Sequence, residues 1–223
     1  MNDKQLVALR AAQYVQNGML VGLGTGSTAN YFIEELARLT REQGLRCTTI
    51  ASSTISTQKA QSLQLPIVAL EHVASIDLYV DGADEITPDK TLLKGRGSDL
   101  VKEKLLAKAA TKFIAVADAS KLVNHIGQNF TIPIEVIPFA WQMAKKSLEA
   151  LGGVGDLRPN AAKDGFWITS HGSYVLDMRF DASIDASTLN AILNNTPGVV
   201  EHGIFHQLAD VILIAQDGVV SER

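Results

Sequence analysis

The chain has 223 residues, of which 46% are hydrophobic and 20% are charged, so it can form one good-sized core, or one core with a small added subdomain. Its net charge of -4 argues against broad nucleic-acid binding, which needs a concentrated basic surface, and no apolar run is long enough to span a bilayer. Because the start has no leader-like segment and Cys47 is the single cysteine, we expect a cytoplasmic protein without an intrachain disulfide.

Strand-length apolar runs alternate with segments of helical period through the first half of the chain, a pattern typical of a parallel sheet covered by helices. The predicted strands are residues 19–23, 48–51, 67–70, 76–80 and 113–116. The predicted helices are residues 27–41, 54–63 and 98–111. In the first of these helices, the side chains placed to face the sheet are Tyr31, Phe32, Leu36 and Leu39. This half is therefore predicted to be α/β.

The pattern changes after Gly127, where prolines at 133 and 138 precede a predicted helix over residues 140–151. Short strand-like runs around Trp167 and Val175, followed by a further helix over residues 186–193, predict a small α+β subdomain. The apolar residues 211–215 are expected to return as a buried strand of the main sheet.

A glycine-rich turn, Gly22 to Thr28, is predicted where the first strand meets its helix. Glycines let the backbone approach a phosphate, and the amides of a helix start can donate to it together with Thr and Ser hydroxyls. The alternative is a tight turn in which Ser27 or Thr28 caps the helix. Because Ala29 replaces the third glycine of a dinucleotide fingerprint and no P-loop ending follows, a single phosphate ester suits the turn better than NAD or ATP.

The segment Asp81-Gly82-Ala83-Asp84-Glu85 follows the predicted strand 76–80, at the carboxyl edge where open α/β sheets bind ligands. Three carboxylates in one turn raise each other's pKa values, which favours a polyhydroxy ligand, a cation or a nearby lysine as compensation. Solvated acids in a simple Asp-Gly turn and a magnesium site are the alternatives. No histidine lies nearby in the sequence, and Lys94 can supply positive charge.

A short loop, Lys94-Gly95-Arg96-Gly97, leads into the predicted helix that begins near Ser98, and a lysine beside such a loop suits an oxyanion. On this helix Glu103 is the informative residue, because its wheel sector is apolar and its sequence neighbours Lys102 and Lys104 point elsewhere. The apolar neighbours are Leu100, Leu106, Ala107 and Ala110. A carboxylate directed at an apolar wall is expected to be more basic than a surface glutamate. The alternative is a glutamate at the rim that extends to water.

Four motifs in this order, GTGSTA, DGADE, the segment from Lys94 to Lys104 and ADASK, resemble type A ribose-5-phosphate isomerase. The resemblance runs from the N-terminal helix through IPIEVIP and continues more weakly to the end of the chain. It implies a doubly wound α/β catalytic domain, residues 1–127 with 204–223, and an inserted ferredoxin-like α+β subdomain, residues 128–203. It also implies a homodimer without metal or other cofactor, which converts ribose 5-phosphate reversibly into ribulose 5-phosphate in the pentose phosphate pathway.

By position, the proton acceptor of the family falls on Glu103. Its substrate contacts fall on Thr25, Gly26, Ser27, Thr28, Asp81, Gly82, Ala83, Asp84, Lys94, Gly95, Arg96, Gly97 and Lys121. In the implied reaction Glu103 moves a carbon-bound proton through an enediolate, and Lys94 stabilises the developing oxyanion. Asp81 and Asp84 hold the sugar hydroxyls and assist ring opening. Lys121 is assigned only through the ADASK match, and its alternative is an exposed loop lysine.

The sequence departs from the family pattern at Arg96, where glycine is expected, and at Ser98-Asp99, where small apolar residues usually follow. The segment SHGS at 170–173 replaces the more usual DNGN turn, and its His171 is predicted to be a solvated turn residue. The remaining histidines show no metal-ligand spacing and are predicted to be structural: His72, His125, His202 and His206.

Two other hypotheses are compatible with parts of this pattern. A sugar-phosphate-sensing module can share the fold and the glycine turn, but it would need no equivalent of Glu103 and normally carries a DNA-binding segment, for which this sequence gives no signal. An amino-sugar phosphate deaminase or a lactonase would place a histidine in the site, and none of the five histidines lies in the motifs above.

Overall fold

The structure, a computed structural model, describes residues 2–97 and 99–223. These residues form two compact units. Unit 1 comprises the chain up to Ala83 together with Lys102–Lys121 and Leu208–Arg223, and unit 2 comprises Asp84–Val101 and Leu122–Gln207. The domain boundaries expected from the sequence, after residue 127 and before residue 204, remain a prediction.

Unit 1 contains a six-stranded sheet in the order β13-β12-β6-β3-β1-β2. Its strands are β1 (Leu20–Leu23), β2 (Thr48–Ala51), β3 (Ile76–Gly82), β6 (Ala110–Asp118), β12 (Val211–Gln216) and β13 (Val219–Glu222). Neighbouring strands are parallel except β12 and β13, which form an antiparallel hairpin. From β1 the chain passes to β2 on one side and later to β3 on the other, the reversal that defines a doubly wound fold.

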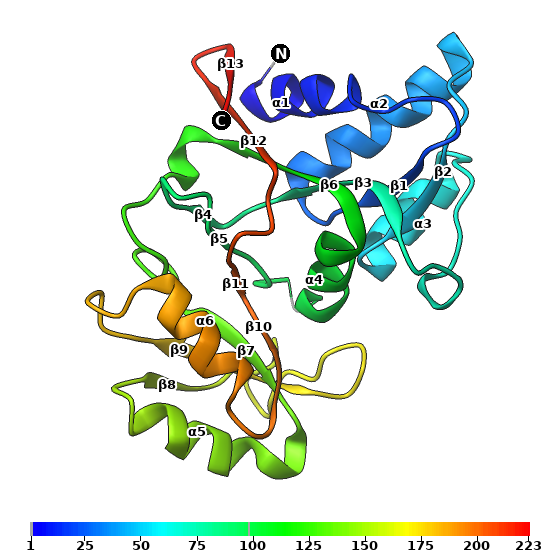
Figure 1. Ribbon diagram of the computed structural model, residues 1–223. Helices are drawn as coiled ribbons and strands as arrows, with labels where there is room; N and C mark the ends of the chain where they lie inside the picture. Colours follow the sequence, from blue (N-terminus) through cyan, green and yellow to red (C-terminus); the bar gives the residue numbers. More distant parts are fainter. Residues whose placement is uncertain (1, 98) are drawn as a thin grey trace. The chain divides into compact units, whose positions relative to one another are not determined.

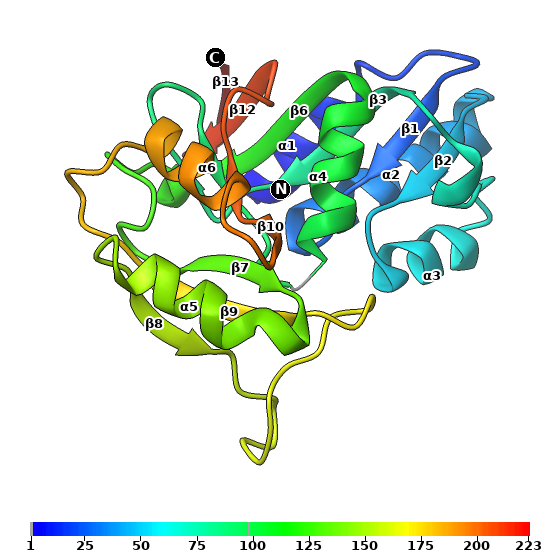
Figure 2. The same cartoon turned by 60° about the horizontal axis from the view of Figure 1, so that its bottom comes forward.

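Helices α1 (Asp3–Ala12) and α2 (Ser27–Gln43) lie on one side of this sheet, and α3 (Thr54–Ser62) and α4 (Leu100–Ala109) lie on the other (Figure 1, Figure 2). A capping box between Asn2 and Gln5 begins α1, and Gly44 ends α2 with a left-handed φ of 71°. Phe32 and Leu36 of α2 are fully buried in the core against the sheet.

Unit 2 contains a four-stranded antiparallel sheet, β10-β7-β9-β8, and a three-stranded sheet, β11-β5-β4. The strands are β4 (Glu85–Ile86), β5 (Leu92–Leu93), β7 (Ile132–Val136), β8 (Val154–Leu157), β9 (Tyr174–Arg179), β10 (Val199–His202) and β11 (Ile204–Phe205). Its α-helices are α5 (Trp141–Glu149) and α6 (Ala186–Asn194). Alternate residues of β7, Ile132, Ile134 and Val136, pack in one core with Leu148 of α5 and Leu189 of α6.

The described residues also form three short 3-10 helices: η1 (Leu70–His72), η2 (Ala119–Lys121) and η3 (Pro138–Ala140). The predicted α/β class with a small antiparallel subdomain is confirmed, and residues 211–215 do return to the main sheet within β12. In the described part of the chain, no helix combines the length and the apolar character that crossing a membrane requires.

Three predicted elements were wrong in part. Residues 67–70 form no strand, because Ile67 makes a single bridge to Thr49 and Leu70 already begins η1. The helix predicted over 98–111 ends at Ala109, since the chain enters β6 directly; the predicted start at Ser98 lies outside the described residues. Trp167 lies in no named strand, although its neighbours Phe166 and Ile168 make isolated bridges.

Candidate active site

Apart from Glu103, the site residues predicted for unit 1 lie at the carboxyl ends of its parallel strands. β1 ends just before the turn Thr25–Thr28, and β3 ends with Asp81 and Gly82. β6 ends at Asp118 and leads into η2, which holds Lys121. Because parallel strands present their carboxyl ends at one edge of the sheet, these segments lie at the edge where doubly wound folds bind ligands.

The turn before α2 leaves the start of that helix open to an anion. Gly26 is the N-cap residue, and its φ of 108° is one that favours glycine. No side chain caps the helix, so the alternative in which Ser27 or Thr28 is the cap is wrong. The first amides of α2 and the exposed Ser27 are therefore placed to bind an anion.

Asp81 anchors this turn from the end of β3. Its side chain is fully buried, and its Oδ1 accepts the amides of Thr25 at 3.0 Å and Gly82 at 2.7 Å. Its Oδ2 accepts the hydroxyl of Tyr79 at 2.5 Å. A Cβ on Gly24 would lie 2.1 Å from Oδ1 of Asp81, so this glycine makes room for the carboxylate and not, as its motif suggested, for a phosphate.

A cluster of buried serines holds Thr25 from the side of β2 and α3. Thr25 Oγ1 lies 3.0 Å from Ser52 Oγ and donates to Ser53 Oγ at 2.8 Å. Ser56 Oγ donates to the carbonyl oxygen of Gly24 at 2.6 Å. These serines were not predicted as site residues, although Ser52 and Ser53 directly follow the predicted strand 48–51, a position at the ligand-binding edge.

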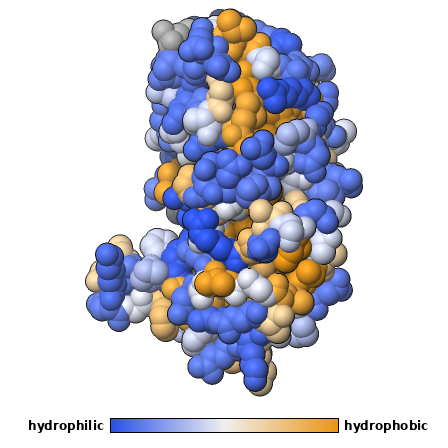
Figure 3. Space-filling model, turned by 90° about the vertical axis from the view of Figure 1, so that its left-hand side faces the viewer, coloured by the Kyte–Doolittle hydropathy of each residue, from blue (hydrophilic) through white to orange (hydrophobic). Residues whose placement is uncertain are grey.

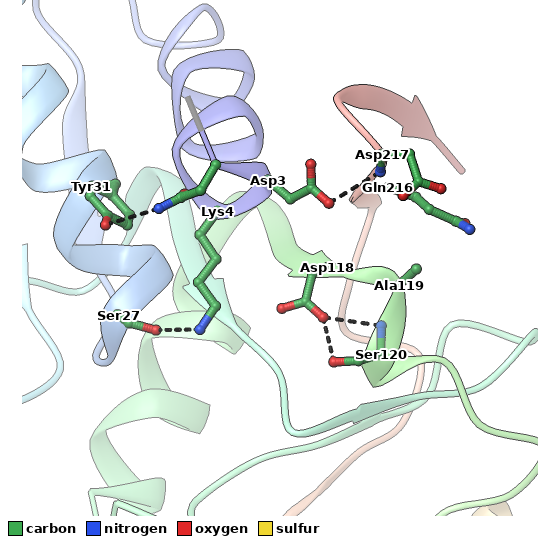
Figure 4. Close-up of a pocket in the computed structure, with 10 residues that line it drawn as sticks. Asp3, Lys4, Ser27, Tyr31, Asp118, Ala119, Ser120, Gln216 and Asp217 are labelled. Atoms are coloured by element: carbon green, nitrogen blue, oxygen red, sulfur yellow. Dashed lines mark hydrogen bonds between the residues drawn. The ribbon is translucent and has the colours of Figure 1, made fainter.

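A lysine of α1 also contacts the turn. Lys4 Nζ donates to Ser27 Oγ at 3.0 Å, and both residues line a pocket of about 530 Å³ with Asp118 and Ser120 (Figure 4). No sequence signal pointed to Lys4, because its contact depends on how α1 packs beside α2.

Two lysines act on the carboxyl of Asp118, and one of them, Lys4, lines the same pocket. Burial acts to raise the pKa of this carboxyl, but hydrogen bonds from Ser120 and the charges of Lys121 and Lys4 outweigh it and the pKa is lowered. Lys121 is half-buried in η2. Its charge and that of Lys4 both act on Asp118, so both lysines lie near this carboxyl. Lys4 is therefore the cation that contacts the turn directly, and Lys121 adds positive charge near Asp118.

Glu103 lies on α4 and is buried, with 4% of its surface exposed. The predicted apolar neighbours Leu100 and Leu106 are fully buried, so the rim position considered as the alternative is wrong. Lys104 is buried as well. The pKa of Tyr79 is raised by burial first, then by the charges of Asp81 and Glu103, which means that both carboxylates act on one phenol.

The loop Lys94–Gly97 belongs to unit 2. Lys94 is buried, its amide donates to the carbonyl of Gly203 at 2.9 Å, and its Nζ lies 5.5 Å from the ring centroid of Phe205. Gly95 has a φ of 88°, and a Cβ there would lie 2.6 Å from Cβ of Leu100. Glycine is therefore required at position 95, whereas Gly97 is exposed with open space around it.

The three acids of the DGADE segment have different partners. Asp81 binds the turn described above, whereas the buried carboxylate of Glu85 accepts the amides of Gly127 and Asn129, both at 2.6 Å. Asp84 Oδ1 lies 3.9 Å from Nη1 of Arg96. The three carboxylates are thus bound by separate groups, and no metal-binding group of three or more His, Cys, Asp or Glu exists among the residues described.

Comparison with known proteins gives consistent matches along the chain. The family model for ribose 5-phosphate isomerase A (phosphoriboisomerase A) matches residues 48–218. The chain is 43% identical over 214 residues to ribose-5-phosphate isomerase A of Thermosynechococcus vestitus, covering 96% of this chain and 91% of that protein. It is likewise 43% identical over 214 residues to ribose-5-phosphate isomerase A of Methanothermobacter thermautotrophicus, with 96% and 93% covered.

Two solved structures are similar over their whole length. The ribose 5-phosphate isomerase A of Methanocaldococcus jannaschii has a TM-score of 0.93 and 38% identity, covering 99% of this chain and 97% of that one. A D-ribose-5-phosphate isomerase in complex with phospho-erythronic acid has a TM-score of 0.95 and 35% identity, covering 100% and 99%.

Proposed function

The chain belongs to the ribose 5-phosphate isomerase A family, and we propose that it interconverts D-ribose 5-phosphate and D-ribulose 5-phosphate with Glu103 as the proton-transferring base. The similarity to isomerases over nearly the whole chain favours this reading over a sugar-phosphate-sensing module. The observation that carries the assignment of the base is the burial of the Glu103 carboxylate. Its charge, like that of Asp81 at the ligand-binding edge, raises the pKa of Tyr79, so the two carboxylates lie near the same side chain.

Proton transfer explains why a buried carboxylate is suited to the reaction. The open-chain sugar loses a proton from the carbon beside its carbonyl, and the resulting enediolate regains a proton on the adjoining carbon. One carboxylate can accept and return this proton. Because only 4% of the Glu103 surface is exposed, little water can reach the carboxylate and compete for the proton during the transfer.

The remaining assignments follow charge. The phosphate ester is proposed to bind the open start of α2, with Ser27 and Thr28 as hydroxyl donors and Lys4 and Lys121 as cations. Lys94 is proposed to stabilise the oxyanion that develops on the enediolate. The reaction as proposed uses side chains and backbone amides alone.

The two aspartates are proposed to differ in role. Asp81 is fully buried and accepts three hydrogen bonds from Thr25, Gly82 and Tyr79, which suits an anchor for the binding turn. Asp84 retains a side chain that is 25% exposed, so it is the better placed of the two to assist ring opening.

Replacement of Glu103 by Gln tests the assignment of the base. The amide keeps the shape but cannot accept the proton, so ketose formation from ribose 5-phosphate should fall on the order of a hundredfold or more while the fold and most of the phosphate affinity persist. Deuterium uptake from solvent into recovered substrate measures the same step. Glu149→Gln, at the end of α5 in an ion pair with Lys145, is the control and should change neither rate. Deuterium uptake undiminished in Glu103→Gln would rule out this base.

The homodimer and the cytoplasmic location implied by the sequence stay predictions. They change none of the residue roles proposed above.

A further inference from the structure

A tyrosine lies beneath the site residues of unit 1 and belongs to none of the sequence motifs that identified them. Tyr79 is fully buried in β3, two residues before Asp81, so strand alternation places both side chains on the same face of the sheet. Its ring stacks on Phe113 of β6 with centroids 5.0 Å apart. The stack fixes the ring, and the hydroxyl at its end donates to Asp81 Oδ2 at 2.5 Å.

The carboxylate that Tyr79 contacts is also the one that holds the turn. Asp81 Oδ1 accepts the amides of Thr25 and Gly82, while Oδ2 accepts the hydroxyl of Tyr79. The pKa of Tyr79 is raised well above its usual range, by burial first and then by the charges of Asp81 and Glu103, so the hydroxyl keeps the proton that it donates. A continuous path of hydrogen bonds thus runs from Tyr79 through the carboxylate of Asp81 to the backbone of Thr25.

The backbone of β1 is built around this arrangement. A Cβ on Gly22 would lie 2.6 Å from Cδ2 of Tyr79, and a Cβ on Gly24 would lie 2.1 Å from Oδ1 of Asp81. Both contacts are too close for any side chain at these positions without displacing the tyrosine or the carboxylate. The first two glycines of the motif therefore allow β1 to lie directly against the Tyr79–Asp81 pair.

We propose that Tyr79 is a positioning residue of the isomerase, an inference that rests on the function proposed above. Its hydroxyl holds the Asp81 carboxylate in the orientation in which Oδ1 binds the amides of Thr25 and Gly82. The turn proposed to bind the phosphate is thereby held at its first residue. Without the hydroxyl, a buried carboxylate oxygen loses a donor, and the turn loses its fixed position.

The experiment compares Tyr79→Phe with Tyr14→Phe. Tyr14 is a matched control, because its hydroxyl also donates to a carboxylate, Oε1 of Glu222 at 2.7 Å, but the pair joins the turn after α1 to β13 at the surface. For each variant the KM for ribose 5-phosphate, kcat and the inhibition constant of inorganic phosphate are measured. Tyr79→Phe should raise KM and the phosphate inhibition constant together, by roughly tenfold, with a smaller fall in kcat. Tyr14→Phe should leave all three unchanged.

The split between these constants separates positioning from a general loss of stability. A variant that only loses folded molecules shows a lower apparent kcat with unchanged KM and unchanged phosphate inhibition, and that result would overturn the proposal. If Tyr79→Phe does not fold, Phe113→Leu removes the ring on which Tyr79 stacks, so the hydroxyl is less well fixed and both constants should rise by about threefold. Unchanged constants in Phe113→Leu then overturn the proposal.

Phosphate binding also keeps this inference distinct from the proposed function. It is measured directly by calorimetry on the parent and on the variants. If the parent shows no isomerase activity, the proposed function fails, while weakened phosphate binding in Tyr79→Phe still supports the positioning role. If the parent is active but Tyr79→Phe leaves its phosphate affinity unchanged, the proposed function stands and the positioning role of Tyr79 is overturned.

Discussion

Arg96 occupies a loop position where the family pattern has glycine. Its guanidinium carbon lies 3.9 Å from the ring centroid of Phe130, and its Nη1 lies 3.9 Å from Oδ1 of Asp84. The left-handed turn of the loop is made by Gly95, and Arg96 is not among the described residues with positive φ. The arginine is therefore accommodated without backbone strain, and its side chain is held over an aromatic ring beside a predicted substrate contact.

Replacing Arg96 by Gly should raise the KM for ribose 5-phosphate several-fold with turnover nearly unchanged, because a cation that binds the ground state and the transition state equally is removed. Stability should fall by about 1 kcal/mol, since a cation–π contact is lost and a glycine is gained. Arg96→Lys is the control for charge, because lysine keeps the cation but loses the planar stack. An unchanged KM in Arg96→Gly would show that Arg96 takes no part in binding.

At the scale of residues, the predictable part of the site was the part adjacent to strand ends. Thr25 to Thr28 and Asp81 follow buried strands, and their position at the carboxyl edge could be inferred from the alternation of strands and helices. Tyr79 could not be separated in this way from an ordinary core residue, because its role depends on a hydroxyl contact two positions along the strand. Lys4 depends on the packing of two helices, which no local pattern encodes.

The strand β7 carries a buried acid that no proposed step uses. Glu135 is fully buried, and its pKa is raised from 4.5 to about 7, by burial first and also by the charge of Asp99. Polar groups of Thr169, Val101 and Ser173 act in the opposite direction. His171 Nε2 lies 3.6 Å from Oε2 of Glu135, and this histidine is exposed in a turn, as expected from the sequence.

The raised pKa has a definite consequence for stability. The folded state binds the proton of Glu135 more tightly than the unfolded state, so its contribution is fully present below pH 4.5 and is lost as pH rises to about 7. Glu135→Gln removes this dependence. Relative to the parent, the variant should gain at most about 3 kcal/mol of unfolding free energy between pH 5 and pH 8.

Urea unfolding of parent and variant at both pH values measures this difference. Glu149→Gln, on α5, provides the control, with an expected difference that does not change with pH. A difference for Glu135→Gln that is also the same at pH 5 and pH 8 would show that the carboxyl titrates normally.

At the scale of elements, periodicity predicted the long segments and failed for the short ones. α2 and β12 have strong patterns of buried residues and appeared where expected. The two-residue strands β4, β5 and β11 are too short to have a period, and their pairing arises only in the folded unit. The run at 67–70 has strand composition, but it follows Pro66 and makes one bridge only, so composition alone was insufficient there.

The surface of the molecule bears on whether it associates with itself. Figure 3 shows hydrophobic residues among hydrophilic ones on one face. In unit 2, Phe139 of η3 and Met143 of α5 are 89% and 79% exposed and lie four positions apart. Exposed apolar side chains of this size favour association between chains.

We expect a homodimer, for which light scattering should give about twice the chain mass of 24.0 kDa. The double variant Phe139→Ser and Met143→Ser tests whether this apolar pair takes part, and a lower mass is the expected result. A parent of 24.0 kDa at all concentrations would contradict the dimer.

The position of β12 has a consequence for truncated forms of this protein. β12 lies between β6 and β13 in the sheet, yet it follows unit 2 in the sequence, and Asp3 of α1 accepts the amide of Gly218 in the turn after it. Until β12 is in place, β6 has an unpaired edge, which is a template for pairing with another chain. A variant cut before Val211 would keep that edge permanently exposed and should therefore aggregate.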